Sequence, residues 1–273
     1  MSAVLDPENQ SPGHGAACSG QVDEIVRRLP AMDLATLEAG AALLTRVDRK
    51  YVVPVRTLKS LVHCMGSDWA ALEIEGRRQF GYTSTYFDTE DLATYRAHLQ
   101  RRRRRYKVRV RQYVDSDSCM LEVKRKGLRG LTVKDRRPHP DWQHAELGVE
   151  GNAFVAEALQ GHVTPPVEPL TPVVVTSNRR ATLVSLATRA RLTVDTDLTC
   201  GWGTAKMSLR PGFVVLESKV QGHVSSIDRM LRSLGERPVA ISKYCIGVAA
   251  LGLELPTNPW RRTLRRYFEI AAS

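Results

Sequence analysis

The sequence predicts an α+β fold that is mainly β, an antiparallel barrel or strongly curved sheet of eight strands with flanking helices. Several segments alternate charged and apolar residues with a period of two, which is typical of strands that have one charged and one apolar face. Short turns separate the segments in the first half of the chain, which favours antiparallel pairing. With 273 residues the chain is long enough to bury a full core.

The clearest strand candidate is 105–114, where Lys107, Arg109 and Arg111 alternate with valines. The stretch 114–118 is poor in apolar residues and predicts a hairpin turn into the next strand. Gly127 and Gly130 bracket a further turn. The expected strands are residues 46–53, 80–87, 105–114, 118–126, 130–136, 172–178, 190–198 and 212–220.

Helices are expected between and after these strands. Pro54 suits the first turn of a helix, where its missing N–H costs little. Thr89 can cap a second helix. Ser225 and Asp228 have the spacing of a capping box, and Gly235 marks the end of that helix. The expected helices are residues 33–44, 54–65, 90–100, 152–160 and 225–235, with a last one starting near Ser242.

The chain is expected to form one domain over residues 21–257. Residues 1–20 are rich in Gly, Ser, Pro and Asn, have no apolar run, and are expected to be a disordered leader. The proline-rich stretch 138–171 is expected to be an insertion that interrupts this domain without dividing it. Residues 258–273 are expected to form a basic, amphipathic C-terminal tail.

The net charge of +11 is concentrated in one part of the chain. Residues 96–137 contain 16 Lys or Arg and only four Asp or Glu, so the remainder is close to neutral. Such a patch implies a polyanionic partner: phosphate chains, nucleotides, nucleic acid or an anionic membrane. The five cysteines form no CxxC pair and are expected to be reduced thiols of a cytoplasmic protein. The most apolar stretch, 239–255, is too short and is interrupted by Lys243, so we expect no membrane span.

Five strands each carry a pair of charged residues on alternate positions. Because an unpaired charge is costly to bury, a water-filled tunnel that binds anions explains them better than a packed barrel interior. Arginine offers planar bidentate contacts to phosphate, and lysine offers point charges. The pairs are Asp48 with Lys50, Arg109 with Arg111, Lys124 with Lys126, Lys134 with Arg136, and Glu217 with Lys219.

Seven short motifs occur in an order that resembles the VTC polyphosphate polymerase domain, a member of the CYTH-like triphosphate tunnel metalloenzymes. The resemblance runs from about Leu44 to Leu255. Its motifs are Arg46 to Tyr51, Ser84 to Asp88, Lys107 to Tyr113, Glu122 to Lys124, Arg191 to Asp195, Leu216 to Lys219 and Ser242 to Tyr244.

The resemblance implies an antiparallel eight-stranded β-barrel tunnel that holds a chain of phosphates. It implies transfer of the γ-phosphoryl group of ATP to a growing polyphosphate chain with Mn²⁺ or Mg²⁺, a reaction that depends on alignment and charge neutralisation. The implied catalytic residues are Lys50, Arg109, Arg111, Lys124, Arg191 and Lys243. Further substrate contacts are expected from Lys126, Lys134, Arg136, Arg179, Arg180, Lys219 and Ser242. The expected metal ligands are Glu217, Asp48 and Glu122.

Several alternatives stay open. Either Arg179 or Arg180 matches the motif arginine of that strand. A hydrolase of tripolyphosphate or of an organic triphosphate would have the same fold. Asn178 and Ala240 depart from the family pattern and would suit a non-catalytic sensor of polyphosphate or inositol phosphates. Residues 101–105, all arginine, are compatible with a solvated run, a nucleic-acid patch or a guide for polyphosphate.

The partners expected from the resemblance are ATP and polyphosphate. Nucleic acid is not favoured, since the sequence has no helix-turn-helix, zinc-finger or aromatic RNA-binding signature. A location at the inner face of a membrane, and a membrane partner protein that receives the product, stay open.

Overall fold

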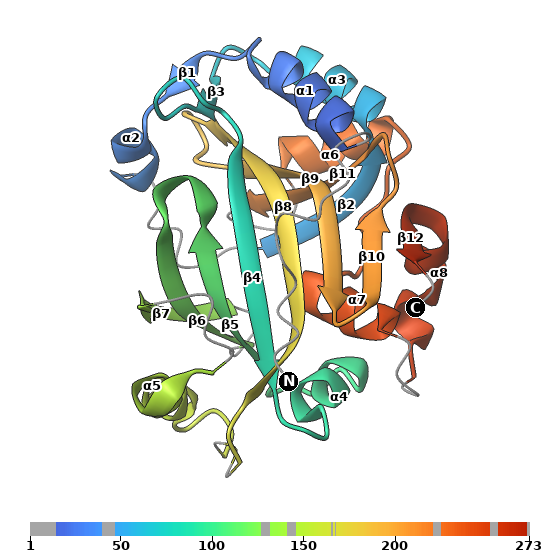
Figure 1. Ribbon diagram of the computed structural model, residues 1–273. Coiled ribbons are helices and arrows are strands. Elements are labelled where there is room, and N and C mark those ends of the chain that lie inside the picture. Colours follow the sequence, from blue (N-terminus) through green and yellow to red (C-terminus); the bar gives the residue numbers. More distant parts are fainter. Residues whose placement is uncertain are drawn as a thin grey trace.

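The computed structural model describes residues 15–39, 47–126, 132–140, 146–164, 166, 168–220, 225–251 and 256–271. These residues form one twelve-stranded sheet with eight α-helices around it (Figure 1). The strands are β1 (Ala31–Met32), β2 (Val47–Pro54), β3 (Trp69–Leu72), β4 (Phe80–Asp88), β5 (Tyr106–Tyr113), β6 (Ser118–Lys126), β7 (Thr132–Pro138), β8 (Thr171–Ser185), β9 (Arg191–Trp202), β10 (Ala205–Leu209), β11 (Phe213–Val220) and β12 (Phe268–Ala271). The helices are α1 (Gly15–Val26), α2 (Leu34–Ala39), α3 (Val55–His63), α4 (Ala93–Leu99), α5 (Gly148–Leu159), α6 (Ser226–Ser233), α7 (Lys243–Ala250) and α8 (Asn258–Tyr267).

The main path through the sheet runs β12-β10-β9-β8-β4-β5-β6-β7, and β11 joins β9 to β2. Every pairing except that of β1 with β3 is antiparallel. This confirms the predicted α+β class and the mainly antiparallel sheet. In the described part of the chain no ladder joins β7 to β2, so the predicted closed barrel is not confirmed.

All eight expected strands are present as β2, β4, β5, β6, β7, β8, β9 and β11. The short strands β1, β3, β10 and β12 were not predicted, because two to five residues show too little alternation to be detected. The hairpin turn after β5 is confirmed as a 3-10 turn over Val114–Ser116. The turn expected at Gly127 and Gly130 lies outside the described residues.

Most helix signals are also found in the structure. The exception is α4, which begins at Ala93 with Leu92 as its N-cap instead of Thr89, whose Oγ1 accepts a 2.9 Å bond from the backbone N–H of Ala93. Ser225 and Asp228 form the predicted capping box of α6, and Gly235 follows the helix with a φ of 84°. Ser242 caps α7 through a 3.1 Å hydrogen bond from the backbone N–H of Cys245. The five cysteines are free, as predicted.

Both predicted chain ends include ordered elements. Helix α1 begins at Gly15, within the range 1–20 expected to be a disordered leader. Residues 1–14 lie outside the described part of the chain. The expected basic tail instead forms α8 and β12, and β12 pairs with β10. The reason is amphipathicity, since α8 buries Trp260, Leu264 and Tyr267 on one side and exposes its arginines on the other.

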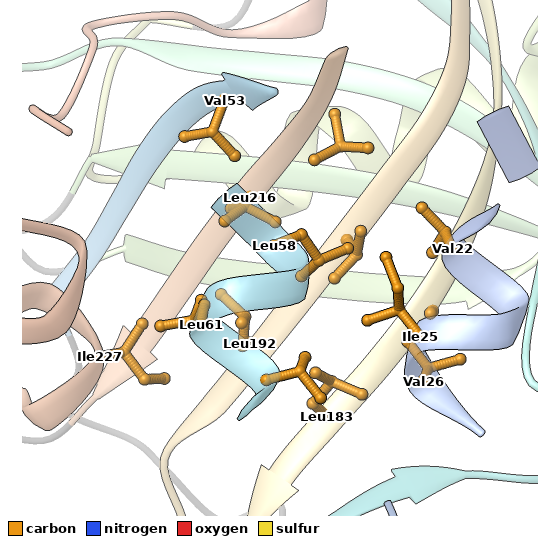
Figure 2. Close-up of a cluster of buried hydrophobic side chains, with 14 of the residues drawn as sticks. Val22, Ile25, Val26, Val53, Leu58, Leu61, Leu183, Leu192, Leu216 and Ile227 are labelled. Carbon is orange, nitrogen blue, oxygen red and sulfur yellow. The ribbon is translucent and has the colours of Figure 1, made fainter. Parts of the chain in front are cut away.

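The largest apolar cluster lies between the sheet and helices α1, α3 and α6. Figure 2 shows Val53 of β2, Leu216 of β11 and Leu192 of β9 directed toward Leu58 of α3 and the side chains of α1. These strand residues have one parity. Because successive side chains of a strand point to opposite faces, the residues between them project to the other side of the sheet.

Two further clusters complete the core, one on that other side of the sheet and one under α5 on the same side as the largest cluster. Helices α4, α7 and α8 pack with Val52, Val215 and Tyr86 around the buried Tyr244. Helix α5, in the predicted insertion, covers Val108 and Val110 of β5 together with Leu121 of β6. Strand β8 follows this insertion and pairs with β4, which precedes it, so the sheet continues across the insertion.

Candidate functional site

The strand residues that point away from the α1, α3, α6 helix layer and from α5 form a face rich in charge. On β5 and β6, for example, the valines enter the core while the charged residues between them point to the opposite side. We call this surface the charged face. It comprises Asp48 and Lys50 of β2, Lys107, Arg109 and Arg111 of β5, Glu122, Lys124 and Lys126 of β6, Lys134 and Arg136 of β7, Arg180 of β8, Arg191 and Asp195 of β9, Glu217 and Lys219 of β11, and Lys243 of α7.

The sheet curls so that distant parts of this face come close together. Strands β6 and β11 are five strand spacings apart in the pairing order, which would be roughly 24 Å in a flat sheet. Yet Lys124 of β6 and Glu217 of β11 are close enough to influence each other's pKa. Asp48 of β2, one strand beyond β11, is likewise close enough to Lys126 of β6 to oppose the lowering of its pKa. The charged residues of distant strands therefore face each other.

Glu122 is the buried counter-ion of the β5, β6, β7 part of this face. Its side chain has no solvent exposure. One carboxylate oxygen accepts two hydrogen bonds from the Arg109 guanidinium, one of them 2.7 Å long, and the other oxygen accepts a 3.1 Å bond from Lys134 Nζ. Burial alone would raise the pKa of Glu122, but the surrounding cations, Arg109 first among them, hold it well below its usual range.

Glu217 lies between two lysines on the opposite part of the face. Its Oε1 is 2.5 Å from Lys50 Nζ and its Oε2 is 3.2 Å from Lys219 Nζ. Register explains the first contact, because Glu217 and Lys50 are direct partners across the β11 and β2 ladder. Burial would raise the pKa of Glu217, but Lys219 and Lys50 outweigh it and hold the pKa well below the usual value.

A third cluster joins β8, β9 and the start of α7. Arg180 contacts both oxygens of Asp195, at 2.6 and 2.8 Å, and Lys243 Nζ lies 2.8 Å from Asp195 Oδ2 and also donates to the side-chain oxygen of Asn178. A bulge between Ser177 and Arg179 shifts the register of β8 at this point. Arg180 thereby reaches the charged face while Arg179 is exposed, so Arg180 is the arginine that the fold places in the site.

Among the half-buried cations of the charged face, Lys107, Arg111 and Lys124 form no ion pair with a carboxylate in the described part of the chain. Arg111 instead contacts Ser84 Oγ at 3.4 Å and lies over the Tyr82 ring, 5.2 Å from its centroid. Burial, and after it the charge of Arg109, lowers the pKa of both Lys124 and Arg111, with a large effect on Lys124. The cations repel one another, and a bound anion would relieve this repulsion.

Of the remaining predicted residues, Arg191 and Arg136 lie at the border of the charged face, and Ser242 caps a helix. Arg191 pairs in register with Lys219 at one end of the β9 and β11 ladder. Arg136 is exposed and opposite Glu122 in the β6 and β7 register. The Ser242 hydroxyl accepts the hydrogen bond that caps α7 and so positions the helix start that carries Lys243.

Sequence reasoning gave no site role to Asp195, Tyr82 or Tyr86, and it considered Asn178 only as a departure from the family pattern. Asp195 has the same parity on its strand as Arg191, so the period of two could have identified it. Tyr86 OH accepts a 3.0 Å bond from Arg109, and Tyr82 lies between Arg111 and Arg180. Nothing in the sequence pattern of β4 signals those stacking contacts.

The predicted metal ligands do not form a cage. Among the residues that the structure describes, no three His, Cys, Asp or Glu side chains lie together as a ligand set. Mg²⁺ in phosphoryl-transfer sites is often held by one or two carboxylates, with phosphate oxygens and water completing the shell. Asp48 and Glu217 lie on adjacent strands of the face and fit that arrangement. Both oxygens of Glu217 contact lysines, as both oxygens of Glu122 contact cations, but Glu217 is partly exposed whereas Glu122 is fully buried.

Asp88 is a fully buried carboxylate that contacts α4 and the start of α7, next to Lys243 of the charged face. It accepts hydrogen bonds from the backbone N–H groups of Thr89, Thr94 and Tyr95, at 2.8 to 3.0 Å, and from Tyr244 OH. Tyr244 follows Lys243 in the chain, and its ring packs 5.4 Å from that of Tyr86. Asp88 therefore connects α4 and α7 at the point where α7 presents Lys243.

We expect Asp88→Asn to lower the free energy of unfolding by about 2 kcal/mol, because an amide nitrogen would face donors that now bind a carboxylate oxygen. Thermal and urea unfolding measure this. Asp91→Asn is the matched control, since Asp91 is exposed and its 3.6 Å contact with Arg96 is expected to contribute less than about 0.5 kcal/mol. Equal stability of the two variants would show that the Asp88 network does not hold α4 to α7.

Comparison with protein families identifies the chain. The model of the VTC domain matches residues 45–252, which is more than half of the chain, and the chain belongs to the VTC domain family. Comparison with curated proteins gives no match. None of the described helices is long and apolar enough to cross a membrane.

Several solved structures are similar to this chain at low identity. A Hippeastrum protein described as having a dominant triphosphatase activity is 15% identical, with a TM-score of 0.46 over 77% of this chain and 98% of its own. A protein from Pyrococcus horikoshii OT3 is 13% identical, with a TM-score of 0.39 over 70% and 90% of the two chains. A conserved hypothetical protein from Pyrococcus furiosus is 12% identical, with a TM-score of 0.39 over 70% and 91%.

Proposed function

We propose that this VTC domain is a metal-dependent polyphosphate polymerase, which transfers the γ-phosphoryl group of ATP to a growing polyphosphate chain. The observation that carries the proposal is the excess of cations on the charged face, with Lys107, Arg111 and Lys124 lacking carboxylate partners among the described residues. A linear chain of phosphates supplies repeated negative charge along a path lined by several strands. We further propose that the curled sheet encloses this path as a tunnel.

The roles follow from position on the face. Lys124, Arg109 and Arg111 lie on neighbouring strands and would hold phosphate oxygens, with Arg109 oriented by Glu122 and Tyr86. Lys50, Arg180 and Lys243 approach from the opposite strands and from α7. Groups fixed on both sides would align the attacking and leaving oxygens and stabilise the negative charge that is redistributed during transfer.

A divalent metal, Mn²⁺ or Mg²⁺, would be held by Glu217 and Asp48. Bound there with the phosphates, it would neutralise phosphate charge. Lys50 and Lys219 neutralise Glu217 in the described arrangement, and binding of phosphate would give both lysines a new anionic partner. The five free thiols and the use of ATP suit a cytoplasmic protein.

Product analysis tests the proposal. Purified protein is incubated with ATP and Mn²⁺, and we expect ADP and long-chain polyphosphate. Inorganic phosphate without polyphosphate would replace the polymerase with a triphosphate hydrolase of the same fold. Binding of tripolyphosphate without any turnover would leave a sensor, a role compatible with the neutral Asn178 that binds Lys243.

The affinity for tripolyphosphate in chelator should decrease as the pH rises above about 8. Burial lowers the pKa of Lys243 to about 8 despite the nearby Asp195, so the free protein loses this cation above that pH. The same group also affects stability when no anion is bound. Between about pH 8 and the ordinary pKa of lysine, Lys243 is largely deprotonated in the folded state but protonated in the unfolded state, so the free energy of unfolding increases as the pH rises through this range.

Titration calorimetry across this pH range measures the effect, with Lys243→Arg as the comparison. The guanidinium of the variant stays charged, so the affinity of Lys243→Arg for tripolyphosphate should decline less above pH 8 than that of the wild type. Parallel pH profiles of the two proteins would mean that Lys243 does not contact the phosphates. Ionisation of the tripolyphosphate is common to both and does not affect the comparison.

A further inference from the structure

Five consecutive arginines, Arg101–Arg105, connect α4 to β5, and we call them the arginine loop. The first four side chains are exposed. Their hydrogen bonds go to uncharged groups: Arg102 Nε donates to Gln100 Oε1 at 2.7 Å, and Arg105 donates to the carbonyl of Arg102 at 2.6 Å. No carboxylate of the described residues forms an ion pair with any of the five, so the described part of the chain leaves their charge unneutralised.

The arginine loop borders the charged face. The backbone N–H of Lys126 donates to the carbonyl of Arg105 at 2.9 Å. Burial is the main cause of the lowered pKa of Lys107 and of Lys126, and Arg105 lowers both further. Positive charge therefore continues from the charged face, through Lys107 and Lys126, onto the arginine loop.

A cavity of about 700 Å³ lies beside the loop, between α4 and residues 163, 164, 166 and 168. Arg102, Arg104 and Arg105 line it, as do the carboxylates of Glu90, Asp91 and Glu168. Asp91 is bound by Thr89 Oγ1 at 2.7 Å and by Arg96 at 3.6 Å. None of the three carboxylates pairs with an arginine of the loop, so the arginines remain available to an anion.

We propose that the arginine loop is a second polyphosphate site, which binds the part of a long chain that extends beyond the charged face. This inference rests on the proposed function for its ligand and goes beyond it in assigning a separate site. The ligand follows from the continuous positive charge between the two sites. A polyphosphate chain that leaves the charged face at Lys107 and Lys126 would reach the arginine loop next. A phosphate chain carries charge on every unit, which matches consecutive arginines without requiring a fixed register.

Nucleic acid is the competing polyanion. Sites for single strands combine cations with several aromatic side chains on which bases stack. Among the described residues around the cavity, Tyr106 is the one aromatic side chain, and it is half-buried. The loop therefore offers phosphate contacts without a stacking platform.

The test compares two triple variants of the full chain. Arg102→Gln, Arg103→Gln and Arg104→Gln remove three charges from the loop. The matched control, Arg56→Gln, Lys59→Gln and Arg229→Gln, removes three exposed charges from α3 and α6; α3 lies at the end of the sheet opposite α4 (Figure 1). Titration calorimetry in chelator measures binding of tripolyphosphate, long-chain polyphosphate and mixed-sequence single-stranded DNA at several salt concentrations.

We expect the loop variant to bind long-chain polyphosphate about tenfold more weakly, and to bind tripolyphosphate as the wild type does. The slope of log affinity against log salt for the long chain should become shallower by about two. The control variant should keep the wild-type values. Unchanged tripolyphosphate affinity also shows that the loop variant is folded.

Three results would overturn the inference. An equal loss of long-chain affinity in both variants would indicate a general charge effect. An equal loss for tripolyphosphate and the long chain in the loop variant would place the arginines in the first site. DNA affinity equal to that for polyphosphate, lost in the same variant, would make the loop a nucleic-acid site. Failure of the proposed function is distinct, since it would appear as wild-type protein that makes no polyphosphate from ATP.

Discussion

Glu122→Gln should lower the free energy of unfolding by about 3 to 5 kcal/mol, the cost of breaking a buried ion pair by removing one partner. The substitution keeps the shape of the side chain but leaves Arg109 buried without its counter-ion. It also removes the anion that Lys134 contacts at 3.1 Å. The melting temperature should decrease by roughly 10 °C in the absence of any anion.

Glu150→Gln is the matched control for this variant. Glu150 also pairs with an arginine, Arg137, at 2.9 Å, but its side chain is 86% exposed, so we expect a change within about 0.5 kcal/mol. Tripolyphosphate in chelator should raise the melting temperature of Glu122→Gln more than that of the wild type, because the face has gained one net positive charge.

Acid sensitivity provides an independent measurement on the same residue. Because the folded state holds the pKa of Glu122 well below its usual range, its contribution to stability is complete above about pH 4.5 and is lost as the pH decreases below it. The wild type should therefore lose more stability on acidification than Glu122→Gln. A variant that melts like the wild type at neutral pH would show that Glu122 is solvated and that this part of the sheet is open.

The period-two pattern predicted much of the fold and of the candidate site. On β5, β6, β9 and β11 it separated core residues from charged ones, because side chains on a strand alternate strictly between faces. The pattern is local, however, and could not show that Lys124 of β6 lies near Glu217 of β11. That proximity depends on the curvature of the sheet, which arises from strands far apart in the sequence.

Ion pairing was the second feature beyond sequence reasoning. The metal ligands were inferred as carboxylates of the face, yet Glu122 is bound by Arg109 and Lys134, and Glu217 by Lys50 and Lys219. Strand register decides such partners, since Glu217 is directly opposite Lys50. The ambiguity between Arg179 and Arg180 had a similar origin, because a bulge changes which residue faces inward and leaves no reliable mark in the sequence.

Glu217→Gln should reduce turnover with ATP and Mn²⁺ by about 100- to 1,000-fold, the effect of losing one preorganised electrostatic group at a reacting centre. Binding of tripolyphosphate in chelator should be unchanged or stronger, because a negative charge is removed from a phosphate site. The fold should persist, since Gln keeps the side-chain shape and leaves Lys50 and Lys219 partly exposed, at 29% and 13%.

The dependence of turnover on Mn²⁺ concentration distinguishes a metal ligand from a counter-ion. Glu217→Asp keeps the charge on a shorter side chain, so it should retain part of the turnover and require more Mn²⁺ for half-maximal rate. If Glu217 only neutralises Lys50 and Lys219, Glu217→Gln should instead keep its Mn²⁺ requirement and most of its rate, and the metal would have to be held elsewhere. Asp48 lies on the neighbouring strand. If it shares the ion with Glu217, Asp48→Asn should also need more Mn²⁺ than the wild type for half-maximal rate, as Glu217→Asp does.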